Sequence, residues 1–403
     1  MQQRLTRLAY LSMITASSTI SLAGVTTPEI ARTFHAEPYE IGYAVTLFTT
    51  SYSLAIYLNG FALEKINIKR ELAGTLFAMF ISVIAVAASP SLQVYRFSMA
   101  LYGLSVGVLY SISYYCVASL YKGKERASKL SFNSFSYSFG SLLGPFLAGL
   151  ALRQNINWTT IYFSTIGLLA FLLFFSRQLD FSYLRQSNGR EAAGTEKWNI
   201  AVYIIALAIF CYVIAESIVS YWIVTYSNTV IGMEIGAASF TLAIFWGFVA
   251  IGRLSAGLIS RRVAANHYIL VTSLLAILAL TAFILWADRI EYAYVLIACV
   301  GFGFSSIFSL LMSFGIAQID HISSKLMSLY MVAGAVGNIF GLFFSSYINQ
   351  NFGLPRTLLI SIAALTIVHS LTWMTTYLSH QKKREVQSTT PLLRITESVR
   401  GEE

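Results

Sequence analysis

Twelve long apolar runs divide this sequence, and each of them is long enough to cross a lipid bilayer. A membrane-spanning helix needs about 20 apolar residues to cross about 30 Å of hydrocarbon. Lipid offers no hydrogen-bond partners to a peptide backbone, so each run must be a helix or part of a closed barrel. The runs are about twice as long as a barrel strand and lack its alternation of apolar and polar residues, which favours helices. They lie near residues 8–28, 41–62, 72–89, 94–120, 130–152, 158–176, 198–226, 235–258, 268–287, 291–315, 326–349 and 356–379.

The composition excludes a soluble enzyme. Only 11% of the 403 residues are charged, whereas soluble chains usually carry about 25%. The three cysteines, Cys116, Cys211 and Cys299, lie singly in apolar runs, and the histidines are scattered. We therefore expect no disulfide framework, no metal site and no cofactor. The sequence also lacks a GxxxxGK[ST] nucleotide loop, so we expect no ATP-driven transport. Asp320 and His321 have no third catalytic partner nearby in the sequence, so we expect no enzymatic activity.

The basic residues predict how the spans are oriented. If the amino terminus is cytoplasmic, 21 of the 27 Lys and Arg residues fall in cytoplasmic loops and tails. Cytoplasmic loops of membrane proteins are enriched in these residues. We therefore expect a multi-pass protein of the inner (plasma) membrane with both termini in the cytoplasm. The net charge of +9 then reflects this topology and does not indicate nucleic-acid binding.

The two halves of the chain carry an internal repeat. Gly140-x-x-x-Gly144 matches Gly337-x-x-x-Gly341 at an offset of about 197 residues. Duplicated halves of six helices build secondary transporters, whose substrate site lies near the bilayer midplane between the halves. The repeat predicts an all-α membrane protein with twelve transmembrane helices in two pseudo-symmetric six-helix bundles.

A polar segment separates the two sets of six runs and sets the expected domain boundaries. We expect an amino-terminal six-helix bundle over residues 1–176 and a cytoplasmic linker over residues 177–197. A carboxyl-terminal six-helix bundle over residues 198–379 and a cytoplasmic tail over residues 380–403 complete the chain.

The loop after the second run reads Gly60, Glu64, Lys65, Lys69, Arg70. This pattern resembles the signature of the major facilitator superfamily, with Glu64 in place of the usual Asp and Asn67 in place of the usual Gly. The resemblance implies that Glu64 contacts a neighbouring helix end and favours one access state; a solvated charged loop is the alternative. The expected residues of this conformational site are Gly60, Glu64 and Lys65, with Gly257, Arg261 and Arg262 in the second copy, which lacks the acid.

Further segments indicate which type within this superfamily the sequence resembles. Cys211–Glu216 and Gly252–Arg261 resemble the fucose permease type of sugar–proton symporter. Leu58–Arg70 in the first half is more similar to the TsgA-like branch of that type. The resemblance implies a monomer that moves a small polar, sugar-like solute together with protons by alternating access. The acids that such symporters carry in the first and fourth helices fall on Gly24 and Tyr110 here, so coupling must use other residues.

Two charged residues lie well inside the spans, Glu216 and Arg253. A charge at this depth costs about 2.5–3.5 kcal/mol on insertion scales, so it usually faces a cavity or a partner. Glu216 is the candidate for proton coupling; the alternative is a structural Glu, or one that holds substrate without titrating. Arg253 lies toward the cytoplasmic end of its span, where it can reach the interface, and we expect a gating or structural role.

One face of the helix at residues 130–152 is polar. Asn133, Tyr137, Ser141 and Gly144 share this face, and Ser134 lies on its flank. We expect this face to meet a central cavity, although small and hydroxyl residues also pack membrane helices together. The expected substrate-binding residues are Asn133, Ser134, Tyr137, Tyr110, Tyr114, Ser220 and Asn338.

Gly140-x-x-x-Gly144-Pro145-x-x-Ala148-Gly149 resembles the fifth-helix motif of drug–proton antiporters, with one Gly replaced by Ala148. Proline removes a backbone donor and can bend a helix, so Gly144 and Pro145 are candidates for a conformational role. Proton-driven efflux of drugs or metabolites is therefore the alternative function. A nutrient sensor that binds without transport is less favoured, because residues 380–403 contain no recognisable signalling domain.

Overall fold

Helices account for almost all of the chain that the computed structural model describes, which is residues 2–63, 66–121, 123–181, 198–259, 264–287, 289–316 and 324–400. The amino-terminal half contains α1 (Gln2–Thr33), α2 (Pro38–Ala62), α3 (Ile68–Ala87), α4 (Leu92–Leu120), α5 (Gly123–Arg153) and α6 (Trp158–Arg177). The carboxyl-terminal half contains α7 (Ile200–Thr229), α8 (Ile235–Ile259), α9 (Ala265–Trp286), α10 (Ile290–Phe304), α11 (Ile307–Ile316), α12 (Ser324–Phe352) and α13 (Leu354–Arg400).

Within the described residues, twelve helical segments are long and apolar enough to cross a membrane. The shortest have 20 residues, which corresponds to about 30 Å of helix. The helices α10 and α11 together form one of these segments, Ile290–Gly315. The predicted all-α fold with twelve spans is therefore confirmed.

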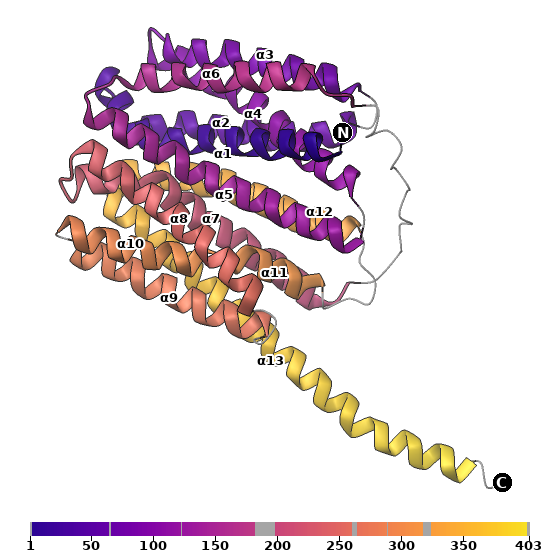
Figure 1. The fold of residues 1–403 in the computed structure, drawn as a ribbon. Coiled ribbons are helices and arrows are strands. Elements are labelled where there is room, and N and C mark those ends of the chain that lie inside the picture. Colours follow the sequence, from indigo (N-terminus) through magenta and orange to yellow (C-terminus); the bar gives the residue numbers. More distant parts are fainter. Residues whose placement is uncertain are drawn as a thin grey trace.

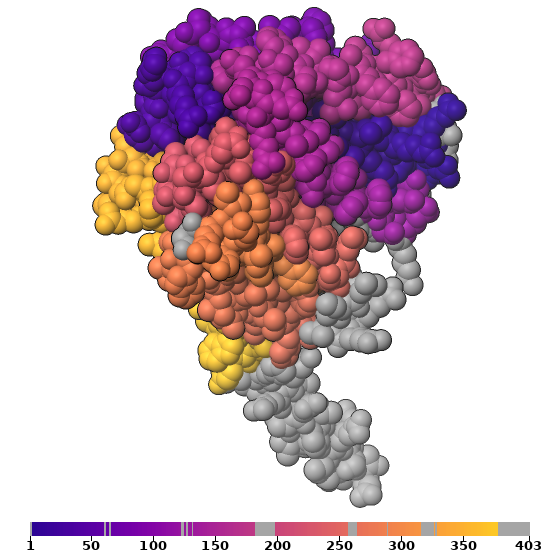
Figure 2. All heavy atoms as spheres, turned by 60° about the vertical axis from the view of Figure 1, so that its left-hand side comes forward, coloured from indigo at the N-terminus to yellow at the C-terminus, as the bar shows by residue number. Residues whose placement is uncertain are grey.

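The two halves of the chain lie beside each other. In Figure 1, α1–α6 occupy the upper part of the bundle and α7–α13 the lower part, and the spans run side by side. Figure 2 shows the same division on one face of the molecule. The contacts between the halves run mainly between α5 and α8, between α2 and α12, and between α1 and α7. These helices therefore form the walls of a site between the halves.

Short polar residues begin several helices. The Asn67 and Asn157 side chains each accept a hydrogen bond from a backbone N–H of the first turn, at 3.1 Å in both cases. Ser91 accepts one from Val94 at 3.4 Å. These caps satisfy backbone groups that have no partner within the helix, so α3, α4 and α6 begin where the apolar runs begin.

The repeat seen in the sequence recurs in the packing. A side-chain carbon at Gly103 of α4 would overlap the carbonyl oxygen of Phe48 on α2. A side-chain carbon at Gly301 of α10 would overlap the carbonyl oxygen of Phe245 on α8 in the same way. Both pairs need glycine because backbone meets backbone at the crossing. The two halves therefore use the same close contact at equivalent positions.

The tenth span is interrupted. Residues 291–315 are expected from the sequence to form one continuous helix, but α10 ends at Phe304 and α11 begins at Ile307. Ser305 and Ser306 form a turn between them, and the Ser306 hydroxyl donates to the carbonyl of Gly252 on α8 at 3.2 Å. The Ser305 hydroxyl donates to the carbonyl of Phe302 at 2.7 Å, and local bonds of this kind compete with helix hydrogen bonds. We call residues 304–306 the α10–α11 break.

Most of the expected signature residues lie outside the described part of the chain. These are Glu64, Lys65, Arg261 and Arg262, and of Gly60 and Gly257 only their places in α2 and α8 are described. Lys69 of the same loop is described, and its Nζ donates to the carbonyls of Arg177 and Leu179 at 3.1 and 3.0 Å. It therefore joins the start of α3 to the end of α6.

Candidate functional site

Two cavities lie between the halves. The large cavity has a volume of about 850 Å³ and the small cavity about 120 Å³. The large cavity extends to the end of the bundle where α5 begins and α8 ends, since Ser128, Lys129 and Ala256 line it. The small cavity lies deeper, among residues of α1, α2, α5, α7, α8 and α12. Both therefore occupy the position expected for a transporter's substrate site.

Glu216 lies where the two cavities meet. Three residues line both cavities: Tyr137 of α5, and Val213 and Glu216 of α7. The side chain of Glu216 is 18% exposed, so it is largely enclosed but reaches the cavities. A carboxyl group in this place can contact a bound solute from either cavity.

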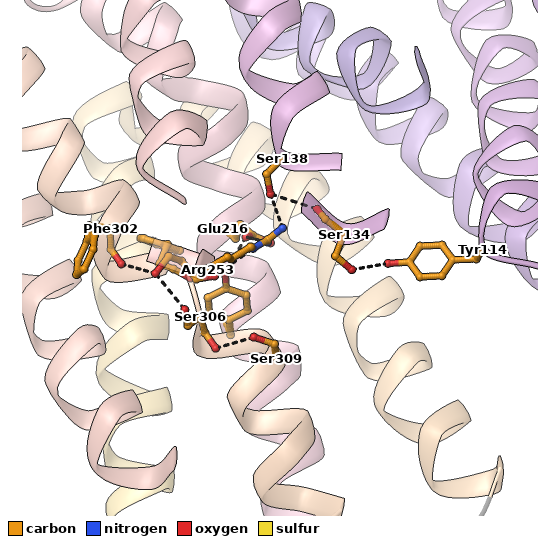
Figure 3. A network of polar contacts seen from close by, with 11 residues as sticks. Tyr114, Ser134, Ser138, Glu216, Arg253, Phe302, Ser306 and Ser309 are labelled. Carbon is orange, nitrogen blue, oxygen red and sulfur yellow. Dashed lines mark hydrogen bonds and ion pairs between the residues drawn. The ribbon is translucent and has the colours of Figure 1, made fainter. Parts of the chain in front are cut away.

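Glu216 and Arg253 face each other across the site (Figure 3). Their nearest charged atoms, Arg253 Nη2 and Glu216 Oε1, are 3.9 Å apart. Arg253 Nη1 also donates a hydrogen bond to the hydroxyl of Ser138 on α5, at 2.5 Å. Arg253 therefore does not extend to the membrane interface but connects the two halves beside Glu216.

The same group of residues holds the α10–α11 break. Arg253 Nε donates to the carbonyl oxygen of Ser305 at 3.1 Å. The hydroxyl of Tyr212 lies 2.7 Å from Glu216 Oε1 and 2.9 Å from the carbonyl oxygen of Phe304. Carbonyls at a helix end lack a partner within the helix, and here side chains of α7 and α8 supply one. The charged site and the break are therefore one structure.

Aromatic side chains form the wall of the large cavity opposite Arg253. The rings of Tyr110 and Tyr114 are 5.0 Å apart, and the ring of Tyr137 stands 6.0 Å from Tyr110 at 90°. Tyr114 shares a hydrogen bond with Ser134 at 3.1 Å. These four residues all line the large cavity. Aromatic faces with hydroxyl tips can contact both the apolar and the polar parts of a solute.

The other expected substrate residues divide into two groups. Ser220 and Asn338 line the small cavity. Asn133 is fully buried against α4, where its side-chain oxygen accepts a hydrogen bond from Ser113 at 3.1 Å. Ser141 is also fully buried and lines neither cavity. The polar face of α5 therefore divides, because α1 and α4 cover part of it.

Gly144 and Pro145 serve the packing of α5. A side-chain carbon at Gly144 would lie 2.6 Å from the carbonyl oxygen of Ser18 on α1. Pro145 lies within α5, which runs from Gly123 to Arg153 as one helix. Gly144 therefore allows α5 to approach α1 closely.

At the end opposite the large cavity the halves are in contact. The hydroxyl of Thr27 on α1 donates to Tyr221 on α7 at 3.1 Å. Tyr43 of α2 donates to Gln350 of α12 at 2.8 Å. Gly42 packs against Trp222 and Ser346. These contacts close the small cavity on that side, so the part of the chain that the structure describes is open at the end of the large cavity.

Sequence reasoning did not select three residues of this site. Tyr212 precedes Glu216 by one helical turn, and this spacing was the available signal. Trp246 of α8 meets Tyr137 across the halves at 5.8 Å between ring centres. Lys129 lines the mouth of the large cavity.

The sequence matches the model described as "Major Facilitator Superfamily" over residues 9–341. The chain belongs to the major facilitator superfamily. It is similar to the protein named "Protein TsgA homolog" of Yersinia pseudotuberculosis serotype O:1b (strain IP 31758), with 25% identity over 94% of this chain and 97% of the relative. The homologue of the same name from Yersinia pestis (strain Pestoides F) is 26% identical over 88% of this chain and 90% of its own length.

Solved structures agree with this membership. The crystal structure of a D-xylose-proton symporter superposes with a TM-score of 0.73, covering 92% of this chain and 97% of the symporter at 14% sequence identity. A partially occluded inward-open structure of the xylose transporter XylE from E. coli gives the same TM-score over 93% of this chain and 97% of its own. This major facilitator protein is therefore a multi-pass membrane transporter of a small molecule, and not an enzyme.

Proposed function

We propose that this transporter carries a small polar, sugar-like solute across the inner membrane together with protons, by opening the cavities between its halves to each side in turn. The observation that carries the proposal is the position of Glu216 between the large and the small cavity. A carboxyl group there can exchange a proton with water in the open cavity and still contact solute in the closed one.

The neighbours of Glu216 support a role in coupling. Arg253 and Tyr212 both contact its carboxyl group, and both also contact the α10–α11 break. A change of charge on Glu216 would therefore alter hydrogen bonds that hold the wall of the large cavity. Coupling of this kind requires a charge change that favours one state of a two-state element.

The orientation of the open cavity is also part of the proposal. Lys129 lies at the mouth of the large cavity, and the loops at this end are rich in Lys and Arg. Because such loops are mostly cytoplasmic, we assign this end and both termini to the cytoplasm. The structure then corresponds to the inward-open state, and the protein works as a monomer.

The sugar-like character of the solute follows from the relatives and the lining. The structural neighbours carry xylose by their printed names. The large cavity combines the rings of Tyr110, Tyr114 and Tyr137 with hydroxyl groups such as that of Ser134. Sugars present both apolar faces and hydroxyl edges, which such a wall can contact.

Export by a drug-type mechanism gains no support from the α5 glycines. Gly140 and Gly144 pack against α1, and Gly149 packs against Ser239 and Gly236 of α8. Helix packing therefore accounts for the motif.

The test is solute-driven proton entry into proteoliposomes that contain a pH-sensitive dye. A panel of pentoses, hexoses and sugar acids is added outside without an imposed gradient. We expect at least one of them to acidify the lumen with the unchanged protein, and none to do so with Glu216→Gln. Glu291→Gln is the matched control, since Glu291 is an exposed acid at the start of α10. Equal acidification by Glu216→Gln would refute the role of Glu216.

A further inference from the structure

The hydroxyl group of Tyr212 stands between two acceptors and has one hydrogen to donate. It lies 2.7 Å from Glu216 Oε1 and 2.9 Å from the carbonyl oxygen of Phe304. Tyr212 and Phe304 are both fully buried, so water does not supply a donor to the Phe304 carbonyl in place of Tyr212. An ionised carboxylate and a backbone carbonyl are both acceptors only. With Glu216 ionised, one of the two must therefore go without the Tyr212 hydrogen.

Protonation of Glu216 removes this conflict. The carboxylic acid then donates its own hydrogen to the Tyr212 oxygen, and Tyr212 donates to Phe304. Each polar group in this series of hydrogen bonds from α7 to α10 then has a partner. When Glu216 loses its proton, the Tyr212 hydrogen is drawn to the carboxylate, because a hydrogen bond to a charged acceptor is about twice as strong as one to a neutral acceptor. The Phe304 carbonyl then loses this donor.

The Phe304 carbonyl belongs to the α10–α11 break, where it matters most. Phe304 is the last residue of α10, and carbonyls at a helix end depend on partners outside the helix. Ser305, Phe308 and Ser309 beside and below the break line the large cavity. Figure 3 shows Ser306, Ser309 and Arg253 grouped around it. A carbonyl without a donor at this point weakens the geometry that keeps the cavity wall in place.

We propose that Tyr212 is a positioning residue that passes the protonation state of Glu216 to the α10–α11 break by switching the acceptor of its hydroxyl hydrogen. The proposal rests on the proposed proton coupling at Glu216 and adds the group that transmits it. The observed geometry, in which both acceptors are within reach, is the one that a protonated Glu216 satisfies. Protonation therefore favours the observed state, which is open at the large cavity.

The other charged or titratable groups around Glu216 do not replace this switch. In the described part of the chain, the contacts to the Glu216 carboxyl group come from the guanidinium of Arg253 and the hydroxyl of Tyr212. The titratable or charged side chains that line the two cavities beside Glu216 are Arg253 on α8, Lys129 and Tyr137 on α5, Tyr110 and Tyr114 on α4, Tyr10 on α1 and Tyr221 on α7. The cavity-lining residues of α11 and α12 are uncharged, Asn338 and Phe308 among them.

The test is a double-mutant cycle read by alkylation of one cysteine. Ser128 is exposed at the mouth of the large cavity, so Ser128→Cys, in a protein without Cys116, Cys211 and Cys299, reports the open state. Glu216→Gln supplies a fixed amide donor in place of the carboxylic acid. We expect it to raise the alkylation rate about three- to tenfold, the range that one hydrogen bond of ordinary strength gives in an equilibrium.

In the Tyr212→Phe background, Glu216→Gln should lose most of its effect on the rate, since the contact of Glu216 with Arg253 remains. The matched control is Tyr226→Phe, since Tyr226 is another buried tyrosine of α7 that donates to a backbone carbonyl, that of Ile284 on α9, at 3.4 Å. With Tyr226→Phe the full effect of Glu216→Gln should persist. The same effect with and without the Tyr212 hydroxyl would overturn the role of Tyr212 and leave the proposed function intact. No effect of Glu216→Gln even with Tyr212 present would overturn both.

A second variant covers the case in which Tyr212→Phe does not fold. Glu216→Asp keeps an ionisable group but withdraws it from Tyr212 by one carbon. The alkylation rate at pH 6 and pH 8 is divided by that of the denatured protein at the same pH. The ratio should change with pH in the Glu216 protein and stay constant in the Asp variant. A pH response of equal size in the Asp variant would contradict the proposal.

Discussion

Arg253 of α8 donates a hydrogen bond to the hydroxyl of Ser138 on α5, so one guanidinium group joins the two halves of the transporter. The same side chain donates to Ser305 at the α10–α11 break and lies 3.9 Å from Glu216. The fork of donors on an arginine can make these contacts at once, whereas the single ammonium of a lysine cannot. The interface between the halves thus contains a charge that responds to Glu216.

Arg253→Lys should reduce the initial rate of transport about tenfold, because it keeps the charge but loses the bridging geometry. Ser138→Ala removes only one of the contacts and should reduce the rate about threefold. Ser136→Ala is the control, since Ser136 bonds within α5 to Phe132. Wild-type rates for Arg253→Lys would show that the bridge has no part in transport.

Thr27→Val should weaken the closure opposite the large cavity. The valine keeps the shape but loses the buried hydrogen bond to Tyr221. A cysteine at Ser21, which lines the small cavity, should then react about two- to tenfold faster with an impermeant reagent added outside. Thr46→Val is the control, because Thr46 bonds within α2 to Gly42. Unchanged labelling in the Thr27 variant would mean that this contact does not hold the closed side.

Gly103→Ala and Gly301→Ala should each lower the stability of the detergent-solubilised protein by about 1–3 kcal/mol, because the added carbon forces two backbones apart. Their equal effect would follow from their equivalent places in the two halves. Gly74→Ala and Gly167→Ala are the controls, since a side-chain carbon there meets nothing within 4 Å. The melting temperatures of the four variants check this. Equal melting temperatures for the Gly103 and Gly301 variants and for the two control variants would contradict it.

Variants of Asn133 and Ser220 should distinguish an effect on stability from an effect on solute binding. Asn133→Ala removes a buried partner of Ser113 and should lower stability by about 1–3 kcal/mol with KM unchanged. Ser220→Ala alters the wall of the small cavity and should raise KM with the melting temperature unchanged. Melting curves and uptake kinetics of the two variants decide. An increased KM for Asn133→Ala would place it in the substrate site after all.

The sequence was sufficient for the fold because each span must satisfy its own backbone in lipid. It was not sufficient for the break in the tenth span. Residues 291–315 are mostly apolar, and the interruption depends on contacts of Ser306 and Ser305 with Gly252 and Arg253 on another helix. The Ser305–Ser306 pair alone does not predict a break, because these contacts follow from tertiary packing.

The same reason explains what was missed in the site. Glu216 and Arg253 were selected separately as intramembrane charges, but their pairing depends on how α7 rotates against α8. Helical periodicity places Asn133 and Tyr137 on one face of α5, yet α4 covers the first and the large cavity receives the second. The residue pattern of one helix predicts which residues share a face, but it does not predict which helices pack against that face.

The most direct test of proton coupling through Glu216 compares proton-driven accumulation of the solute with exchange of the solute. Proteoliposomes with an inward proton gradient receive the solute identified by lumen acidification, and the same vesicles preloaded with that solute measure exchange without a gradient. We predict that Glu216→Gln abolishes accumulation while exchange continues, because an amide cannot carry a proton but leaves the cavities in place. Accumulation equal to that of the unchanged protein would contradict proton coupling through Glu216.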